Sequence, residues 1–143
     1  SAIMSNVNDN KRLFIANRVF PEVKIDEDLI VMSDIKWLNF LIGQFITNAV
    51  KYTFEPNKKL YITAVQKEQH VHLFIRDEGV GIPKSDLPRV MKPFFTGENG
   101  RKTGESTGMG LYIAKEICDK LGHQLLITSE VGKGTQIEVI FQS

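Results

Sequence analysis

Three polar residues, Gln44, Asn48 and Lys51, recur at helical spacing in the segment QFITNAVKYT, residues 44–53. Residues three or four positions apart lie on one face of an α-helix. An amide oxygen is a hard ligand suited to Mg²⁺, and a lysine ammonium group can neutralise phosphate. A solvated helix face is the simpler interpretation of this stripe when the helix is considered alone. The stripe therefore indicates a binding site only in combination with other segments of the chain.

Asp77 closes a predicted strand and opens the glycine loop DEGVGIP, residues 77–83. Gly79 and Gly81 carry no side chain, so a flat ligand can lie against the loop backbone. The amino group of adenine is a natural hydrogen-bond donor to such a carboxylate. The alternative is an ordinary Asp-Glu-Gly turn, and in either case we expect Glu78 to face solvent.

A second glycine-rich segment, STGMGL at 106–111, places Gly108 and Gly110 at the start of a predicted helix. Free N–H groups and the helix dipole attract anions there, although a glycine loop before an ordinary helix is the plainer alternative. The spacing matches neither GxxxxGK[ST] nor GxGxxG. With the glycine turn of VGKGTQIEVIF, residues 131–141, the four segments together predict an ATP pocket of a different kind.

The elements that must position these residues follow from periodicity and from turn residues. A helix is predicted from Ser33 or Asp34 to near Tyr52, and a second from Met109 to Leu121, which Gly122 ends. The predicted strands are 13–20, 29–32, 60–66, 70–76, 123–129 and 135–141, with a short helix at 85–90 and a long loop at 92–107. Strands segregated from helices favour an α+β two-layer sandwich whose sheet is covered on one face. We expect residues 1–12 to be a tail or linker and residues 13–143 to be one domain.

Bulk composition narrows the function classes. The 143 residues include 18 basic and 17 acidic side chains, and a net charge of +1 gives no reason to expect nucleic-acid binding. The single cysteine, Cys118, excludes an intrachain disulfide. No apolar run approaches the roughly 18 residues that span a bilayer, and no signal-peptide pattern is present. We therefore expect a soluble, monomeric fragment.

In order, the four segments resemble the N-box, the two glycine boxes and the glycine-threonine box of the ATP-binding domain of sensor histidine kinases. This superfamily also includes gyrase, heat-shock protein 90 and mismatch-repair ATPases. The resemblance covers residues 13–142 and implies the Bergerat fold, with a mixed, mostly antiparallel sheet. Residues 92–123 also resemble the intramembrane-sensing kinases of Gram-positive bacteria, which respond to antimicrobial peptides alongside an ABC transporter.

The resemblance implies a role for each matching position. The catalytic and metal residues would be Gln44, Asn48 and Lys51, with Mg²⁺ on Asn48 beside Gln44 and phosphate on Lys51. The base would be held by Tyr52, Asp77, Gly79, Gly81, Ile82 and, through water, Thr135. Phe94 and Phe95 would form the phenylalanine box, and residues 96–107 an ATP lid carrying Arg101 and Lys102. The phosphates would lie on Thr107, Gly108, Met109, Gly110 and Leu111.

Gln44 separates subclasses within this resemblance. The ATP-hydrolysing relatives carry a glutamate at this position, where it can act as a general base. An amide cannot take up the proton, so we expect slow hydrolysis. His70, His72 and His123 lie outside any phosphoacceptor setting and are expected to be structural.

The implied function is therefore donation of the γ-phosphate of ATP to a histidine on a separate dimerisation domain, with a response regulator downstream. The chain would be a cytoplasmic part of a membrane kinase. The alternatives are a hydrolysing ATPase, an anti-sigma-type serine kinase and a module that binds without acting. One position departs from the family pattern: the glycine that usually precedes the second glycine box is displaced, since Gly104 is followed by ESTG. This departure concerns the geometry of the lid.

Overall fold

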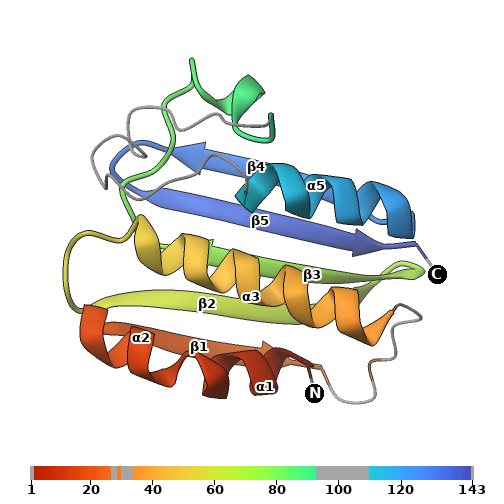
Figure 1. The fold of residues 1–143 in the computed structure, drawn as a ribbon, viewed down its shortest axis with the longest axis horizontal. Helices are drawn as coiled ribbons and strands as arrows, with labels where there is room; N and C mark the ends of the chain where they lie inside the picture. The colour runs from red at the N-terminus through yellow and green to blue at the C-terminus, as the bar shows by residue number, and fades with distance from the viewer. Residues whose placement is uncertain (1, 27–28, 30–33, 93–109, 143) are drawn as a thin grey trace.

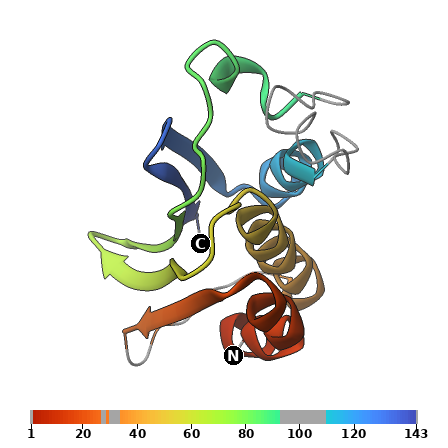
Figure 2. The ribbon, with the colours of Figure 1, turned by 90° about the vertical axis from the view of Figure 1, so that its left-hand side faces the viewer.

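The computed structural model describes residues 2–26, 29, 34–92 and 110–142. These residues form a five-stranded sheet with helices packed on one face (Figure 1), and the opposite face carries no helix in the described part of the chain (Figure 2). The strands are β1 (Val19–Ile25), β2 (Lys58–Lys67), β3 (His70–Asp77), β4 (Gln124–Glu130) and β5 (Gly134–Phe141). The helices are α1 (Ala2–Asp9), α2 (Lys11–Asn17), α3 (Ile35–Lys51), the 3₁₀ turn η1 (Leu87–Arg89) and α5 (Gly110–Leu121).

The strand order is β1-β2-β3-β5-β4. β1 and β2 are parallel, which requires a crossover, and α3 provides it. The other neighbouring pairs are antiparallel. The expected two-layer architecture, with a mixed and mostly antiparallel sheet covered on one face, is therefore confirmed.

The core lies between the sheet and α3. Strand side chains alternate between the two faces, and the apolar set faces the helices. On the strands this set includes Leu60, Ile62, Leu73, Ile75, Ile137 and Val139, and α3 contributes Leu41, Ile42, Phe45 and Ile46. Asp34 starts α3 by accepting hydrogen bonds from the backbone N–H groups of Lys36 and Trp37 at 2.9 and 3.2 Å.

The N-terminal region differs from the sequence-based expectation. Residues 13–20 were expected to be a strand, but Lys11–Asn17 forms α2, and the strand begins at Val19. Arg18 separates the two in a left-handed conformation with φ 53°. Residues 2–9 of the expected tail form α1, which packs on α3 and buries Ile3. Tertiary packing of the helices outweighs the strand preference of a short apolar run.

The two predicted long helices and the four later predicted strands agree with the structure within the described residues. α5 buries Ala114, Ile117 and Cys118, and Gly122 follows it with φ 77°. The predicted short helix at 85–90 is a single 3₁₀ turn. Of the predicted strand 29–32, only Leu29 is described, and it is not in a strand. None of the helices in the described ranges is long and apolar enough to cross a membrane.

Candidate nucleotide site

Asp77 is the last residue of β3, the central strand, and is buried. Its Oδ1 accepts hydrogen bonds from the backbone N–H groups of Gly79, at 2.9 Å, and Thr135, at 3.1 Å. Within the described residues, Oδ2 has no hydrogen-bond partner and can accept one from a ligand. Burial raises the pKa of Asp77 from 3.8 to about 6, and the two backbone hydrogen bonds offset part of that rise.

The loop after Asp77 packs against the C-terminal end of α3. The backbone N–H of Val80 donates to the carbonyl oxygen of Tyr52 at 3.1 Å. A Cβ at Gly79 would lie 2.4 Å from that same carbonyl oxygen. Thr53, also buried, donates its hydroxyl to the carbonyl of Ala49 at 2.8 Å and so completes the end of the helix. Gly79 is therefore required by close packing of two backbones.

The same loop packs on its other side against the turn between β4 and β5. The N–H of Gly132 donates to the carbonyl of Val80 at 2.9 Å. Gly81 has φ 78°, and a Cβ there would lie 2.2 Å from the carbonyl oxygen of Glu130. Gly134 has φ 127°, and a Cβ there would lie 2.0 Å from the carbonyl oxygen of Asp77. The glycines of two distant sequence segments thus let three backbone segments meet beside one carboxylate.

Ser129, near the end of β4, connects this loop to Thr135. Its Oγ accepts a hydrogen bond from the N–H of Ile82 at 2.7 Å and donates to the carbonyl of Gly134 at 2.9 Å. It also lies 2.8 Å from Oγ1 of Thr135. Asp77, Ser129, Gly134 and Thr135 line one hollow of about 310 Å³, together with Arg76, Thr128, Glu130, Lys133 and Gln136. The base-binding residues predicted from two separate glycine boxes are therefore brought together.

The polar stripe of α3 leads to the same end of the molecule. Gln44, Asn48 and Lys51 are all partly exposed, whereas Phe45 and Ala49 between them are buried. The C-terminal end of α3, the end of β3 and the start of α5 lie at one edge of the fold (Figure 1). The Nζ of Lys51 lies 5.8 Å from the ring centroid of Tyr52, within the range of a cation–π contact.

Gln44 and Asn48 fit Mg²⁺ by the chemistry of their donors. Neither side-chain amide is hydrogen-bonded to another described residue, so both oxygens are available. The described residues contain no group of three His, Cys, Asp or Glu side chains that could hold a metal. An ion at Asn48 would take its other ligands from phosphate and water, which is the usual arrangement for Mg²⁺.

The phosphate-binding residues are described only in part. Gly110 and Leu111 form the first turn of α5, where backbone N–H groups are free of helical partners. The other predicted residues lie outside the described ranges: Phe94, Phe95, Arg101, Lys102, Thr107, Gly108 and Met109, together with the lid at 96–107.

Glu78, which was expected to face solvent, is partly exposed, and its Oε1 also accepts a hydrogen bond from the N–H of Lys59 at 2.7 Å, which ties the loop to the start of β2. Two residues of this site were missed in the sequence. Thr53 and Ser129 were not singled out. A hydroxyl residue directly after a helix, or just before a glycine turn, is a weak signal that could have indicated them.

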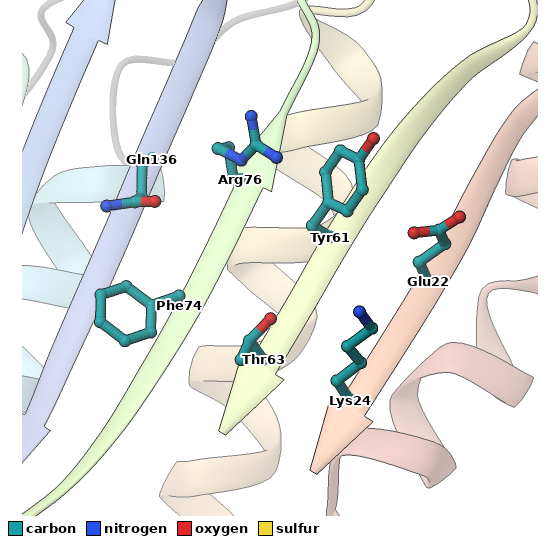
Figure 3. A pocket seen from close by; sticks show the side chains of 7 residues that line it. All are labelled: Glu22, Lys24, Tyr61, Thr63, Phe74, Arg76 and Gln136. Atoms are coloured by element: carbon teal, nitrogen blue, oxygen red, sulfur yellow. The ribbon is translucent and has the colours of Figure 1, made fainter. Parts of the chain in front are cut away.

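A second hollow, of about 470 Å³, lies on the uncovered face of the sheet (Figure 3). It is lined by Glu22, Lys24, Tyr61, Thr63, Phe74, Arg76 and Gln136, whose side chains point away from the helices. The guanidinium of Arg76 lies 4.3 Å from the ring centroid of Tyr61. Arg76 and Gln136 line both this hollow and the one beside Asp77, so the two hollows adjoin at the end of β3 and the start of β5. No residue predicted to bind nucleotide lines the second hollow.

The chain matches a known protein family and two curated relatives. Residues 33–143 match the family described as "Histidine kinase-, DNA gyrase B-, and HSP90-like ATPase". The chain is similar to the sensor histidine kinase YxdK of Bacillus subtilis (strain 168), with 44% identity over 97% of this chain and 43% of the relative. It is also similar to the sensor protein kinase GraS of Staphylococcus aureus (strain Newman), with 42% identity over 84% of this chain and 34% of the relative. The chain thus spans less than half the length of these relatives.

Solved structures share the fold. The mycobacterial sensor histidine kinase MprB has a TM-score of 0.82 at 23% identity, covering 98% of this chain and 91% of that one. The histidine kinase ThkA, in complex with the response regulator protein TrrA, has a TM-score of 0.79 at 20% identity, covering 98% of this chain and 39% of that one.

The family match covers the stripe of α3, the loop at Asp77 and the hairpin at Ser129. The shared fold is the α/β sandwich expected from the sequence, the Bergerat fold. The chain belongs to the histidine kinase-, DNA gyrase B- and HSP90-like ATPase family.

Proposed function

We propose that this domain binds ATP with the adenine at Asp77 and transfers the γ-phosphate to a histidine of a separate dimerisation domain. Asp77 carries the proposal. It is a buried carboxylate whose Oδ1 is held by two backbone N–H groups, while its Oδ2 is left to accept from a ligand. Burying a charge is unfavourable unless a partner compensates for it, and the amino group of adenine would provide that partner.

The phosphates of the bound nucleotide would extend toward Asn48, Lys51 and the first turn of α5. Lys51 contributes positive charge there, and the free N–H groups of the α5 terminus suit an anion. Mg²⁺ held at Asn48, beside Gln44, would neutralise phosphate charge. In phosphoryl transfer, positioning and charge neutralisation account for most of the catalysis. The covalent acceptor is then expected on another domain.

Gln44 favours transfer over hydrolysis, because its amide cannot act as a general base toward water. The three histidines have structural contacts. His72 lies 2.6 Å from Oε2 of Glu138, and His70 bonds to the carbonyl of Phe141 at 3.1 Å. His123 is buried and packs edge-on against the Phe141 ring.

The names of the relatives support the wider assignment. YxdK and GraS are described as sensor kinases of two Gram-positive bacteria. The intramembrane-sensing type and a cytoplasmic position in a membrane protein stay predictions from the sequence resemblance. The complex of ThkA with TrrA supports a response regulator as the downstream partner. An ABC transporter as a further partner stays a prediction from the sequence resemblance.

The deciding experiment is phosphotransfer from γ-³²P-labelled ATP, in Mg²⁺, to a separately purified fragment of YxdK that carries its phosphoacceptor histidine. We expect label that is lost in acid and retained in alkali, as for phosphohistidine. Lys24→Ala, on the far face of the sheet, is the matched control and should transfer normally. Acid-stable label would indicate a serine kinase, and sustained phosphate release without an acceptor would indicate a hydrolysing ATPase. Either result would contradict the proposal.

A further inference from the structure

Ser129 is the point at which three parts of the base site meet. Its single hydroxyl contacts the N–H of Ile82, the carbonyl of Gly134 and the hydroxyl of Thr135, at 2.7, 2.9 and 2.8 Å. A serine hydroxyl has one proton to donate and two lone pairs to accept with. All of this capacity is therefore used by these three neighbours.

The direction of each hydrogen bond follows from the partners. The N–H of Ile82 can only donate, and the carbonyl of Gly134 can only accept. The one proton of Ser129 therefore goes to Gly134. In the remaining contact, Thr135 must be the donor, because Ser129 has no second proton. Ser129 thus fixes the hydroxyl rotor of Thr135.

Thr135 and Asp77 are adjacent at the start of β5 and the end of β3, and both line one hollow. We take Thr135 to contact the base directly, in place of the water-mediated contact that the family resemblance implies. The proton of Thr135 is committed to Ser129, so toward a ligand its Oγ1 can only accept. Oδ2 of an ionised Asp77 also only accepts. Both atoms therefore match a 6-amino purine, which donates, and oppose a 6-oxo purine, which presents an acceptor.

We propose that Ser129 is a specificity-determining positioning residue: by holding the proton of Thr135, it makes the site select 6-amino over 6-oxo purines. The inference rests on the proposed binding of adenine at Asp77. Ser129 acts through Thr135 and does not touch the base itself. A 6-oxo purine is rejected because its acceptor would face the acceptors of Asp77 and Thr135 and leave these polar groups unpaired. Unpaired polar groups discriminate effectively between similar ligands.

The test compares ATP with inosine triphosphate, which replaces the 6-amino group by a 6-oxo group. Both are titrated calorimetrically in Mg²⁺ into the wild type, Ser129→Ala, Thr135→Val and the double variant. We expect the wild type to prefer ATP by about tenfold or more. Ser129→Ala releases the proton of Thr135, which can then donate to the 6-oxo group, so the preference should fall by several-fold.

The ratio separates specificity from a merely structural role. Loss of the Ile82 hydrogen bond in Ser129→Ala should weaken both nucleotides alike and leave their ratio unchanged. In the Thr135→Val background, Ser129→Ala should no longer alter the ratio, because the hydroxyl through which it acts is gone. Ser129→Thr, which keeps a hydroxyl, should restore the wild-type ratio.

Three outcomes would overturn the inference: an unchanged ratio in Ser129→Ala, a change of ratio that persists in the Thr135→Val background, or a wild type without preference for ATP. Failure of the proposed function would look different, because the wild type would then bind neither nucleotide. Lys24→Ala should reproduce the wild-type ratio. Thermal unfolding of each variant confirms that it is folded at the temperature of the titration.

Discussion

The backbone N–H of Thr135 donates a hydrogen bond of 3.1 Å to Oδ1 of Asp77, across 58 residues of sequence. Gly79 donates to the same oxygen from two residues away. The carboxylate is thus oriented jointly by its own loop and by the first residues of β5. This arrangement holds a buried acceptor in place before any ligand is bound.

Asp77→Asn should abolish measurable ATP binding while stabilising the fold at pH 7. The amide oxygen can still accept from Gly79 and Thr135, but the amide NH₂ would face the donor of the base. Because the carboxylate is charged and buried at pH 7, its replacement should raise the free energy of unfolding by roughly 1–3 kcal/mol. Calorimetric titration and urea denaturation measure the two effects, and a variant that binds ATP normally would disprove the adenine assignment.

The stability difference between the wild type and Asp77→Asn should depend on pH. The pKa of Asp77 is about 6 in the folded state, against 3.8 for the ordinary group. Between these values the folded state binds more protons than the unfolded state, so wild-type stability falls as the pH rises from about 4 to 6. The advantage of Asp77→Asn should grow over this window and level off above it. A difference that is constant with pH would contradict the raised pKa.

Affinity for ADP should decrease as the pH falls below about 6, because protonated Asp77 loses its acceptor at Oδ2. We expect a loss approaching tenfold per pH unit, since binding requires one deprotonated group. Titration of ADP into the wild type between pH 5 and 8 measures the effect. Lys24→Ala should follow the wild-type profile, and a flat profile would exclude Asp77 as the acceptor.

Gly134→Ala should destabilise the domain more than Gly132→Ala does. Both glycines have positive φ, so both variants bear a left-handed residue, at a cost of roughly 1–2 kcal/mol. Only at Gly134 would the new Cβ also meet a backbone atom, the carbonyl of Asp77 at 2.0 Å, whereas Gly132 has nothing within 4 Å. Urea midpoints of the two variants give the comparison. Equal losses would show that this close approach is not required.

Gln44→Glu should increase ATP hydrolysis in the absence of an acceptor domain. The carboxylate would lie one helical turn before Asn48 and could take a proton from water. General bases contribute about 10²–10⁴-fold in enzymes, so an increase of at least about tenfold is expected. Phosphate release measures it. Gln44→Ala is the control and should not increase hydrolysis; a similar increase in both variants would show that loss of the amide, not the new base, is responsible.

Cys118 should react with a disulfide thiol reagent only when the domain unfolds. Its side chain is fully buried, and burial raises the pKa of the thiol to about 11, so little thiolate exists at pH 8. The native protein should react far more slowly than a sample in denaturant. Cys118→Ser should keep its affinity for ATP. Rapid labelling of the native protein would mean that α5 separates readily from the sheet.

The sequence alone determined the local elements and the types of residue in the site. The Asn48 stripe, the Asp77 loop and the glycine turn after Glu130 are short-range patterns, and the structure has the predicted helix, loop and hairpin at each. It could not determine that residues 11–17 are helical. The helical conformation of residues 11–17 depends on the packing of α1 and α2 against α3 and β1, and the local sequence preferences of these residues do not contain that information.

Tertiary structure alone decided the hydrogen-bond geometry of the base site. Asp77, Ser129 and Thr135 meet because β3 pairs with β5 and β5 with β4, and because Gly81 and Gly134 allow backbones to touch. Burial then changes the pKa of Asp77, and Ser129 commits the proton of Thr135. Such properties arise from groups far apart in the chain that share a low-dielectric environment, so they appear only once the sheet is assembled.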